Sequence, residues 1–390
     1  MHVLYIIGQS TGGLPHYTAE LTNAVARHAD VTVMKPKETS ADELFAEGVD
    51  MIEAFDSIGV SMPKLHSLDV NPLELFRGVL SYNNLKRIRQ TDADVVHDTT
   101  DLFPQVKLFT ALHDIDELRP FVVTRHEVSV KRFSLSRPPV LAEEIVNYLL
   151  PNVHPARIIA HTENQKRALI ERGRVSDRID VIPHGAYSTF GSHEQANGQV
   201  EENSLLFFGN IVPPKGLDTL VEAIPLVKRE LPNVKLVIAG EGRISESARS
   251  TIEAHRENFE IHNYFVPNDE VGDLFRRAEV VTIPYRKQGG TKGHSGALST
   301  AYSFGKPVVA STASEFPSLV EAAGCGLVVP PEDPEKLAGA IVRVLSNDGA
   351  KAEMSANSLR MAAELSWENI AERHLEVYED VIQKRSEIPK

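Results

Sequence analysis

A glycine-rich turn is the strongest chemical signal in this sequence of 390 residues. Residues 289–296 read GGTKGHSG and stand between a predicted strand and a predicted helix. Glycines allow several backbone N–H groups to point at one anion, and the start of a helix favours negative charge. We expect Ser295 to cap the helix and the N–H groups of Gly296 and Ala297 to hold a diphosphate.

The same segment also suggests a nucleophile. Gly293 to Ala297 reads GHSGA, which approaches the G-x-S-x-G turn of α/β-hydrolases. That turn needs a strand ending directly at its first glycine, whereas Arg286 to Lys292 intervene here. It also needs a later histidine on a loop, and the only one, His374, falls inside a predicted helix. Anion binding is therefore the favoured interpretation.

Cations stand close to this turn. Lys215 is the last residue but one of the segment GNIVPPKG (209–216), which follows a predicted strand. A lysine there is a mobile point charge that suits a phosphate, although a solvated loop lysine would look the same. Arg286 stands shortly before the glycine-rich turn, and Lys292 lies within it. A second glycine pair, Gly12-Gly13, separates the first strand from the first helix, and it either lines an anion or makes a plain tight turn.

Polar residues also follow strands in the first half. His126 and His97 each end a predicted strand, where a side chain can face a cleft or be satisfied by loop carbonyls. Two Asp-x-Asp pairs, at 92–94 and 114–116, could hold a metal on a sugar nucleotide. The first enters its strand at the amino end and the second has the composition of a turn. We therefore expect no metal site.

The elements that must position these residues alternate between short apolar strands and amphipathic helices. Apolar runs such as Val3 to Ile7 indicate parallel strands that are buried on both faces, and the alternation predicts a doubly wound sheet. The polar stretch 188–203 predicts a linker, after which the same pattern restarts. We expect a Rossmann-like domain at 1–187, a second at 204–366, and a C-terminal helix at 367–390 that either caps its own domain or crosses to the first.

Composition bounds the class of protein. Lys+Arg 41 against Asp+Glu 54 gives a net charge of −13, which does not favour nucleic acid as a partner. A single cysteine excludes an intrachain disulfide and indicates a reducing cytoplasm. We expect no targeting segment and no membrane span, because the first apolar run has only the length of a strand.

Taken together, these segments resemble the GT-B glycosyltransferases, closest to family 4. The resemblance covers about residues 1–34, 95–126 and 157–385. It is carried by Gly12-Gly13, VTRHE (123–127), IPHG (182–185), residues 209–216, IAGEG (238–242), SGAL (295–298), AYSFGKPVV (301–309), GCGLVVPP (324–331) and the segment from Trp367 to Tyr378.

The resemblance implies a retaining transfer of a sugar from a nucleoside diphosphate, without metal or other cofactor, in polysaccharide or glycoconjugate biosynthesis. The second domain would hold the nucleotide, with Lys215 at the diphosphate and Val266 at the base. His126 would reach the transferred sugar, and Gly12-Gly13 would line the donor and acceptor path. The acceptor would be a glycan, a lipid-linked molecule or a small molecule.

Two departures from the family pattern concern the sugar. The family's glutamates would fall on Lys292 and Thr300, and neither is acidic. This leaves open a catalytically silent GT-B subunit, and a sugar-nucleotide epimerase of the same fold is a further alternative. Lys131, Arg132 and Arg137 in the first half suggest a surface for an anionic lipid or a lipid-phosphate acceptor, with peripheral contact at the inner face of the membrane. The alternative is a solvated loop.

Overall fold

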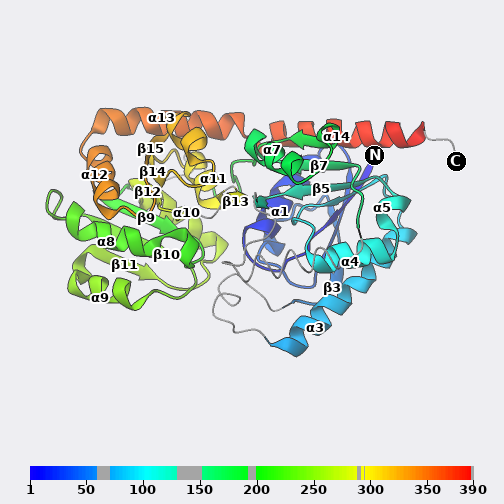
Figure 1. The fold of residues 1–390 in the computed structure, drawn as a ribbon, viewed down its shortest axis with the longest axis horizontal. Helices are drawn as coiled ribbons and strands as arrows, with labels where there is room; N and C mark the ends of the chain where they lie inside the picture. Colours follow the sequence, from blue (N-terminus) through cyan, green and yellow to red (C-terminus); the bar gives the residue numbers. More distant parts are fainter. Residues whose placement is uncertain (59–70, 130–151, 192–198, 288–290, 294, 388–390) are drawn as a thin grey trace.

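The computed structural model describes residues 1–58, 71–129, 152–191, 199–287, 291–293 and 295–387. They form two α/β domains that lie side by side, with helix α13 (Asp348–Glu364) along one side of the second domain and helix α14 (Trp367–Ser386) continuing along the same side of the first (Figure 1).

The first domain is built on a parallel sheet of seven strands, in the order β3-β2-β1-β4-β5-β7-β8. The strands are β1 (His2–Ile6), β2 (Asp30–Pro36), β3 (Val49–Phe55), β4 (Val95–Asp98), β5 (Phe121–Arg125), β7 (Arg157–Ala160) and β8 (Ile179–Val181). Its helices are α1 (Gly13–Val25), α3 (Pro72–Ser81), α4 (Pro104–Leu112), α5 (Ile115–Leu118) and α7 (Glu163–Glu171), with the 3-10 helices η1 (Asp42–Leu44), η2 (Tyr82–Gln90) and η3 (Ser176–Arg178). The sheet is buried on both faces, because separate apolar clusters lie under α1 on one side and under α4 on the other.

The second domain repeats this plan with six parallel strands in the order β11-β10-β9-β12-β14-β15. The strands are β9 (Ser204–Phe208), β10 (Lys235–Ala239), β11 (Phe259–His262), β12 (Val280–Ile283), β14 (Val308–Ser311) and β15 (Gly326–Val329). The helices are α8 (Leu217–Val227), α9 (Glu246–Ala254), α10 (Asn268–Arg277), α11 (Gly296–Ser303), α12 (Pro334–Leu345) and α13 (Asp348–Glu364), with the short turns η5 (Pro213–Lys215), η6 (Arg256–Asn258) and η7 (Pro317–Glu321). The predicted pair of doubly wound sheets is confirmed.

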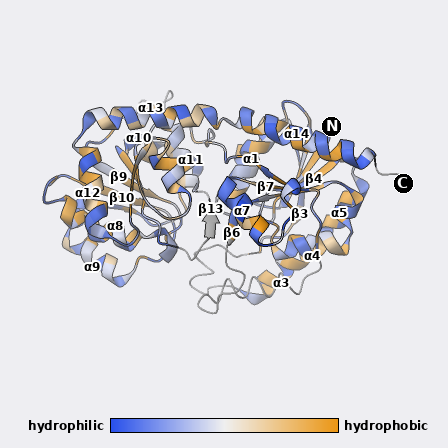
Figure 2. Cartoon of the chain, turned by 45° about the horizontal axis from the view of Figure 1, so that its top comes forward, coloured by the Kyte–Doolittle hydropathy of each residue, from blue (hydrophilic) through white to orange (hydrophobic). Residues whose placement is uncertain are grey.

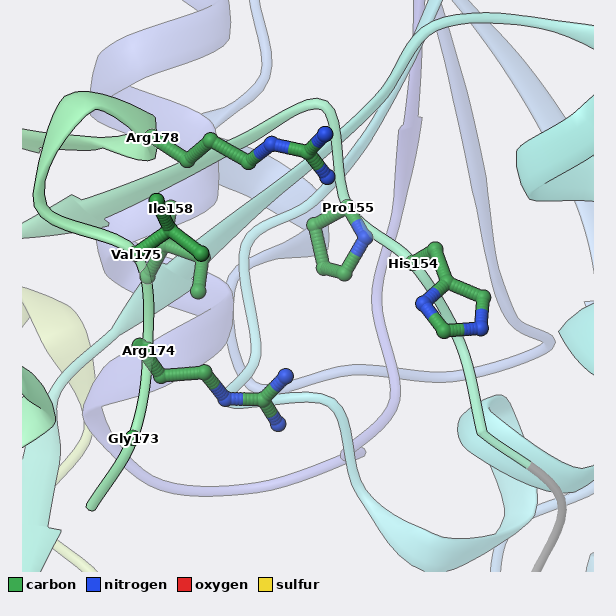
Figure 3. A pocket seen from close by; sticks show the side chains of 7 residues that line it. All are labelled: His154, Pro155, Ile158, Gly173, Arg174, Val175 and Arg178. Atoms are coloured by element: carbon green, nitrogen blue, oxygen red, sulfur yellow. The ribbon is translucent and has the colours of Figure 1, made fainter.

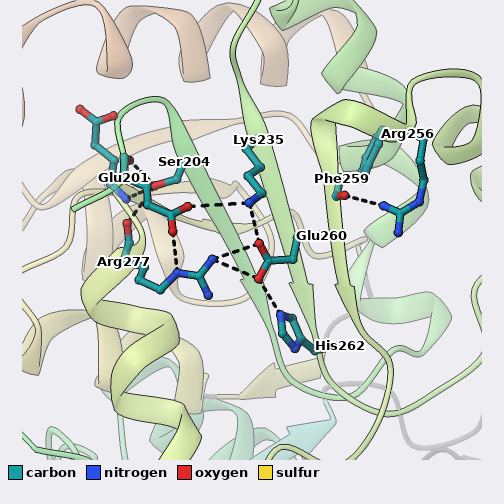
Figure 4. Close-up of polar contacts among 9 residues, drawn as sticks. Glu201, Ser204, Lys235, Arg256, Phe259, Glu260, His262 and Arg277 are labelled. Atoms are coloured by element: carbon teal, nitrogen blue, oxygen red, sulfur yellow. Dashed lines mark hydrogen bonds and ion pairs between the residues drawn. The ribbon is translucent and has the colours of Figure 1, made fainter. Parts of the chain in front are cut away.

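An ion-pair network ties strands β10 and β11 to the end of α10 (Figure 4). Glu260 contacts Lys235 at 2.6 Å and Arg277 at 3.0 Å, and Arg277 also contacts Glu201 at 2.7 Å. Burial raises the pKa of Glu260, but the hydrogen bonds from Arg277, Lys235 and His262 outweigh it and bring this pKa to about 2. The network stabilises the rim of the second domain.

A pair of strands, the C-terminal helix and the predicted linker connect the two domains. The short strands β6 (Glu127–Ser129) and β13 (Thr291–Gly293) pair antiparallel, one from each domain. Helix α14 (Trp367–Ser386) packs its apolar stripe into the core beneath α1. The C-terminal helix therefore crosses to the first domain, which confirms the second of the two arrangements expected for it. The predicted linker is held to α1, because the backbone N–H groups of Ser188 and Thr189 donate to the Glu20 carboxylate.

Candidate active site between the two domains

Lys215 and Ser295 are joined through one tyrosine at the carboxyl edge of the second sheet. The Lys215 ammonium donates to the hydroxyl of Tyr285 and lies 3.9 Å from the centre of its ring. The same hydroxyl lies 2.9 Å from Ser295 Oγ. The predicted cation and the start of the predicted anion-binding helix are therefore one connected unit.

Gly216 explains how the Lys215 loop comes so close to the loop after β12. Its φ of 72° is left-handed, and a Cβ at this position would lie 1.9 Å from the carbonyl oxygen of Pro284. Beyond that contact, Arg286 N donates to Pro214 O at 2.9 Å. The Arg286 side chain binds Asp218 at 3.0 Å and lies 3.7 Å from Glu332, so its charge is already shared with two carboxylates.

Helix α11 begins at Gly296 as predicted, but Ser295 does not cap it with its side chain. Ser295 occupies the N-cap position without a capping hydrogen bond, because its hydroxyl is turned to Tyr285. The expectation of a serine cap is wrong for this reason, whereas the exposed Gly296 leaves the helix start accessible. Residues 288–290 and 294 lie outside the described residues, as does the side chain of Lys292.

The remaining predicted nucleotide contacts are mostly buried. Thr300 donates its hydroxyl to Gly296 O, one turn earlier in α11, and Ala297 is buried beside it. Val266 packs into the apolar core between β10 and α10, so its side chain faces inward. A base at this turn would meet the backbone of Val266 rather than its side chain.

Tyr187, which the sequence pattern did not single out, brings the two predicted anion turns together. Its hydroxyl donates to Gly13 O at 3.1 Å, and its ring lies 3.5 Å from where a Cβ of Gly296 would stand. Gly12 has a φ of 90° at the N-cap of α1, a conformation that glycine adopts without strain. Gly13 from the first domain and Gly296 from the second therefore lie against the same buried tyrosine.

Hydrogen bonds close the cleft beside this point. His16 of α1 lies 2.8 Å from Asn268 Oδ1 at the start of α10, and the amide of Asn268 donates to Ser40 O and to Glu43. On the other side, Asn164 of α7 donates to Glu315. The two domains thus meet through direct polar contacts, between α1 and the start of α10 and between α7 and the loop after β14.

His126 lies in a buried cluster of rings rather than on an open wall. Its Nε2 lies 2.9 Å from Thr99 O, and its Nδ1 lies 3.2 Å from His161 Nε2. Tyr17 is the centre of the cluster, with ring centroids 4.6 Å from His126, 5.5 Å from His161 and 5.1 Å from His184. Both ring nitrogens of His126 contact groups of the first domain. This arrangement matches the alternative interpretation, in which His126 is a structural residue whose nitrogens are satisfied by nearby groups.

The cluster also borders the second domain. Ser299 Oγ of α11 lies 3.2 Å from His184 Nδ1. Next to it a cavity of about 260 Å³ is lined by His161, Thr162, Pro183 and His184 from the first domain and by Ser318, Leu319, Met361 and Leu365 from the second. Burial, followed by the charges of His161 and His126, keeps the pKa of His184 well below its ordinary value. His161 and His184 therefore line a cavity at which the two domains meet.

The other first-half candidates have structural partners. His97 is fully buried between the hydroxyls of Tyr378 at 2.7 Å and Thr124 at 2.8 Å. Asp92 binds His2, and Asp116 accepts from the backbone of His154, both at 2.8 Å. Among the described residues, no group of three or more His, Cys, Asp or Glu side chains is placed to hold a metal ion.

A smaller hollow of about 130 Å³ lies at the amino ends of β7 and β8 (Figure 3). Gly12-Gly13, in contrast, follows the carboxyl end of β1. Arg174, Arg178 and His154 surround an apolar floor of Pro155 and Ile158. Lys131, Arg132 and Arg137, the cations suggested for a lipid surface, lie outside the described residues. In the described part of the chain, no helix has the length and apolarity to span a bilayer.

Comparisons with known proteins agree with this geometry. The family model "Glycosyltransferase Family 4" matches residues 11–187, and the model "Glycosyl transferases group 1" matches residues 202–347. Among solved structures, Anabaena HepE in complex with UDP-glucose superposes with a TM-score of 0.70 at 16% identity, covering 97% of this chain and 100% of that one. The fold is therefore GT-B.

Relatives of known name match at low identity. A GDP-mannose-dependent monoacylated alpha-(1-6)-phosphatidylinositol monomannoside mannosyltransferase of Corynebacterium glutamicum is 31% identical over 42% of this chain, and this match spans only 43% of that relative's length. A D-inositol 3-phosphate glycosyltransferase of Jonesia denitrificans is 24% identical over 94% of this chain and 91% of its own length. With both domain models in their expected order, the chain belongs to the family 4 glycosyltransferases.

Proposed function

We propose that the protein is a retaining, metal-independent glycosyltransferase that moves a sugar from a nucleoside-diphosphate donor to a glycan, lipid-linked or small-molecule acceptor. The observation that carries the proposal is the connected unit of Lys215, Tyr285 and Ser295 at the start of α11. Negative charge on the diphosphate grows as the sugar leaves, and preorganised dipoles with a fixed ammonium stabilise that charge without reorganisation.

The first domain would contribute the acceptor side. Gly12-Gly13 reaches the same point through Tyr187, so the donor phosphates would lie between the two glycine turns. His126 would act on the sugar by position and not by proton transfer, because retention with leaving group and acceptor on one face needs little acid or base. Its neighbours His161 and Tyr17 hold the ring in place.

The relatives support the class of substrate. HepE was solved with UDP-glucose, and the relatives quoted above are named for GDP-mannose, phosphatidylinositol mannoside and inositol 3-phosphate. We therefore expect a UDP- or GDP-linked hexose as donor and a phosphate-bearing or glycolipid acceptor at the inner face of the membrane.

A donor screen tests the proposal. Purified protein is incubated with UDP-, GDP-, dTDP- and ADP-sugars, with and without lipid-linked acceptors, and release of the nucleoside diphosphate is measured. We expect release with one donor class and an unchanged anomeric configuration in the product. Tight binding of the nucleotide without release under any condition would instead support the silent subunit, which the non-acidic Lys292 and Thr300 favour.

A further inference from the structure

One buried histidine bridges the two domains. Helix α1 lies on the side of the first domain that faces the second (Figures 1 and 2), and His16 stands in its first turn. The ring nitrogen Nδ1 lies 2.9 Å from the carbonyl oxygen of Gly12, and Nε2 lies 2.8 Å from Asn268 Oδ1 at the start of α10. The ring therefore connects the Gly12 turn directly to the second domain.

The side-chain amide of Asn268 has only one orientation that its partners allow. Its Nδ2 lies 3.0 Å from Ser40 O and 2.9 Å from Glu43 Oε1, both in the first domain. A carbonyl and a carboxylate only accept hydrogen bonds, so the amide nitrogen, with its two hydrogens, must face them. The amide oxygen of Asn268 is therefore the atom that faces His16.

Both nitrogens of His16 consequently meet oxygen atoms that only accept. A neutral imidazole carries one N–H group and one lone pair, so its lone pair would face either Gly12 O at 2.9 Å or Asn268 Oδ1 at 2.8 Å. An imidazolium carries two N–H groups and donates to both oxygens. The complete contact between the domains thus contains one added proton on His16.

The charges around the ring suit an imidazolium. Acidic side chains stand on three elements near it: Glu20 on α1, Asp42 and Glu43 on η1, and Asp269 and Glu270 in the first turn of α10. Asp42 is already paired with Lys35, and burial raises the pKa of Glu20. Glu43 and the two residues of α10 therefore supply most of the negative charge, which also offsets the unfavourable effect of a helix start on a cation.

We propose that His16 is a positioning residue whose imidazolium latches the second domain to the first through Asn268. The latch joins two parts of the donor site, because Gly12 belongs to the turn expected at the donor phosphates and Asn268 follows Val266, the residue expected at the base. This link to the donor rests on the proposed function, whereas the latch itself does not. Closure on a donor takes up a proton, so the donor binds more weakly as the pH rises.

Spin labels on both sides of the latch test it without any nucleotide. They are attached to the variant Glu47→Cys/Asp273→Cys, whose two positions are exposed, while the native Cys325 is buried. We expect the distance between the labels, measured by double electron–electron resonance, to lengthen as the pH rises from about 5 to 8, the interval in which histidine titrates. Adding His16→Gln should abolish this dependence on pH. A dependence that persists in His16→Gln would overturn the proposal, because another group would then control the distance.

Two asparagines supply the matched comparison. Asn268→Ala and Asn164→Ala each remove a contact between the domains, but only the first contact includes a histidine. Asn268→Ala should give the longer distance at every pH, whereas Asn164→Ala should keep the dependence on pH of the parent protein. Equal behaviour of the two variants would contradict the latch, because a general loosening of the interface would then explain the result.

Calorimetry tests the link to the donor. UDP and GDP are titrated into the parent protein and into His16→Gln, in buffers of different ionisation enthalpy, so that the heats report the protons taken up. The parent protein should take up more protons than His16→Gln and should bind roughly tenfold more tightly at about pH 6, the effect of one hydrogen bond from a charged group. The two proteins should agree within about twofold at about pH 8, where the ring is neutral.

The two experiments separate the latch from the proposed function. Nucleotide binding with equal proton uptake in both proteins would overturn the link between His16 and the donor. Absence of nucleotide binding in both proteins would instead contradict the proposed function, while the distances between the spin labels decide on the latch.

Discussion

His126 Nδ1 and His161 Nε2 lie 3.2 Å apart, and the other nitrogen of each ring faces a backbone carbonyl oxygen, of Thr99 and of Ile182. A carbonyl oxygen only accepts, so both outer nitrogens carry their hydrogens. Two neutral rings would then face each other with lone pairs, and a hydrogen bond between them needs one added proton. Burial lowers the pKa of His126, which disfavours this added proton.

This contact leads to the first prediction, the effect of His126→Ala. If His126 positions the sugar, turnover should fall by about 10²-fold while the affinity for the free nucleoside diphosphate stays near that of the parent protein. The nucleotide is expected on the other domain, which is why the two quantities separate. Turnover and nucleotide affinity are measured on the same preparation.

His161→Gln is the matched control, because its amide N–H can donate to His126 Nδ1, where the neutral ring of His161 presents only a lone pair. It should retain most of the turnover. A melting temperature lowered by many degrees in His126→Ala, with normal turnover of the molecules that remain folded, would show instead that His126 is structural.

The second prediction concerns acid. Burial lowers the pKa of His374 to about 4 in the folded protein, against an ordinary value of 6.5. The unfolded chain therefore binds this proton first, and the folded state loses roughly 3 kcal/mol from this group as the pH falls from about 7 to 4. Asp98 acts in the opposite sense, because burial raises its pKa to about 6 and its protonation favours the folded state over the same interval.

The histidine contribution is isolated by a variant. His374→Gln removes the titrating group, so its free energy of unfolding should fall less between pH 7 and pH 4 than that of the parent protein. Urea unfolding at five pH values measures this difference. Parallel curves for the two proteins would show that His374 does not titrate with a lowered pKa.

Much of this arrangement was predictable from sequence because it depends on local patterns. Apolar runs such as Val280 to Ile283 predict the strands, and the glycines before α11 predict the turn at its start. Lys215 contacts this turn through Tyr285. Residues 38–84 could not be placed, because β3 is an edge strand of mixed exposure and α3 turns apolar residues outward. Neither follows the pattern of an element buried in a core.

The residues that sequence reasoning missed are those whose partners are distant in the chain. Tyr187 contacts Gly13 across 174 residues, and Tyr285 stands between Lys215 and Ser295 only after two loops have folded together. An isolated tyrosine in a turn has no periodicity to reveal it. His161 and His184 likewise gain significance only from the ring of Tyr17 between them.

The third prediction is that activity needs no metal. Asp92 and Asp94 both contact His2 at the amino end of the first sheet, away from the cleft, and Asp114 contacts Arg89. Lys215 with the start of α11 would neutralise the diphosphate instead. Turnover should therefore be the same in excess chelator as in Mg²⁺ or Mn²⁺. Activity that is lost with chelator and restored by either ion would falsify this prediction.

The last prediction concerns Lys215→Ala. The ammonium of Lys215 is fixed by Tyr285, whose hydroxyl also contacts Ser295, so it is already placed when the charge on the leaving diphosphate develops. Loss of one such preorganised group is typically worth about 10²–10³ in rate. We therefore expect a fall of this size in turnover, together with weaker donor binding.

Tyr285→Phe is the matched variant, because it keeps the ring under the ammonium and removes only the hydroxyl. The loss of turnover in this variant should be smaller. Arg286 is the alternative cation, but Asp218 and Glu332 already share its charge. Steady-state kinetics with the donor found in the screen decide between the two cations. A loss of less than tenfold in Lys215→Ala, with a larger one in Arg286→Ala, would assign the diphosphate to Arg286.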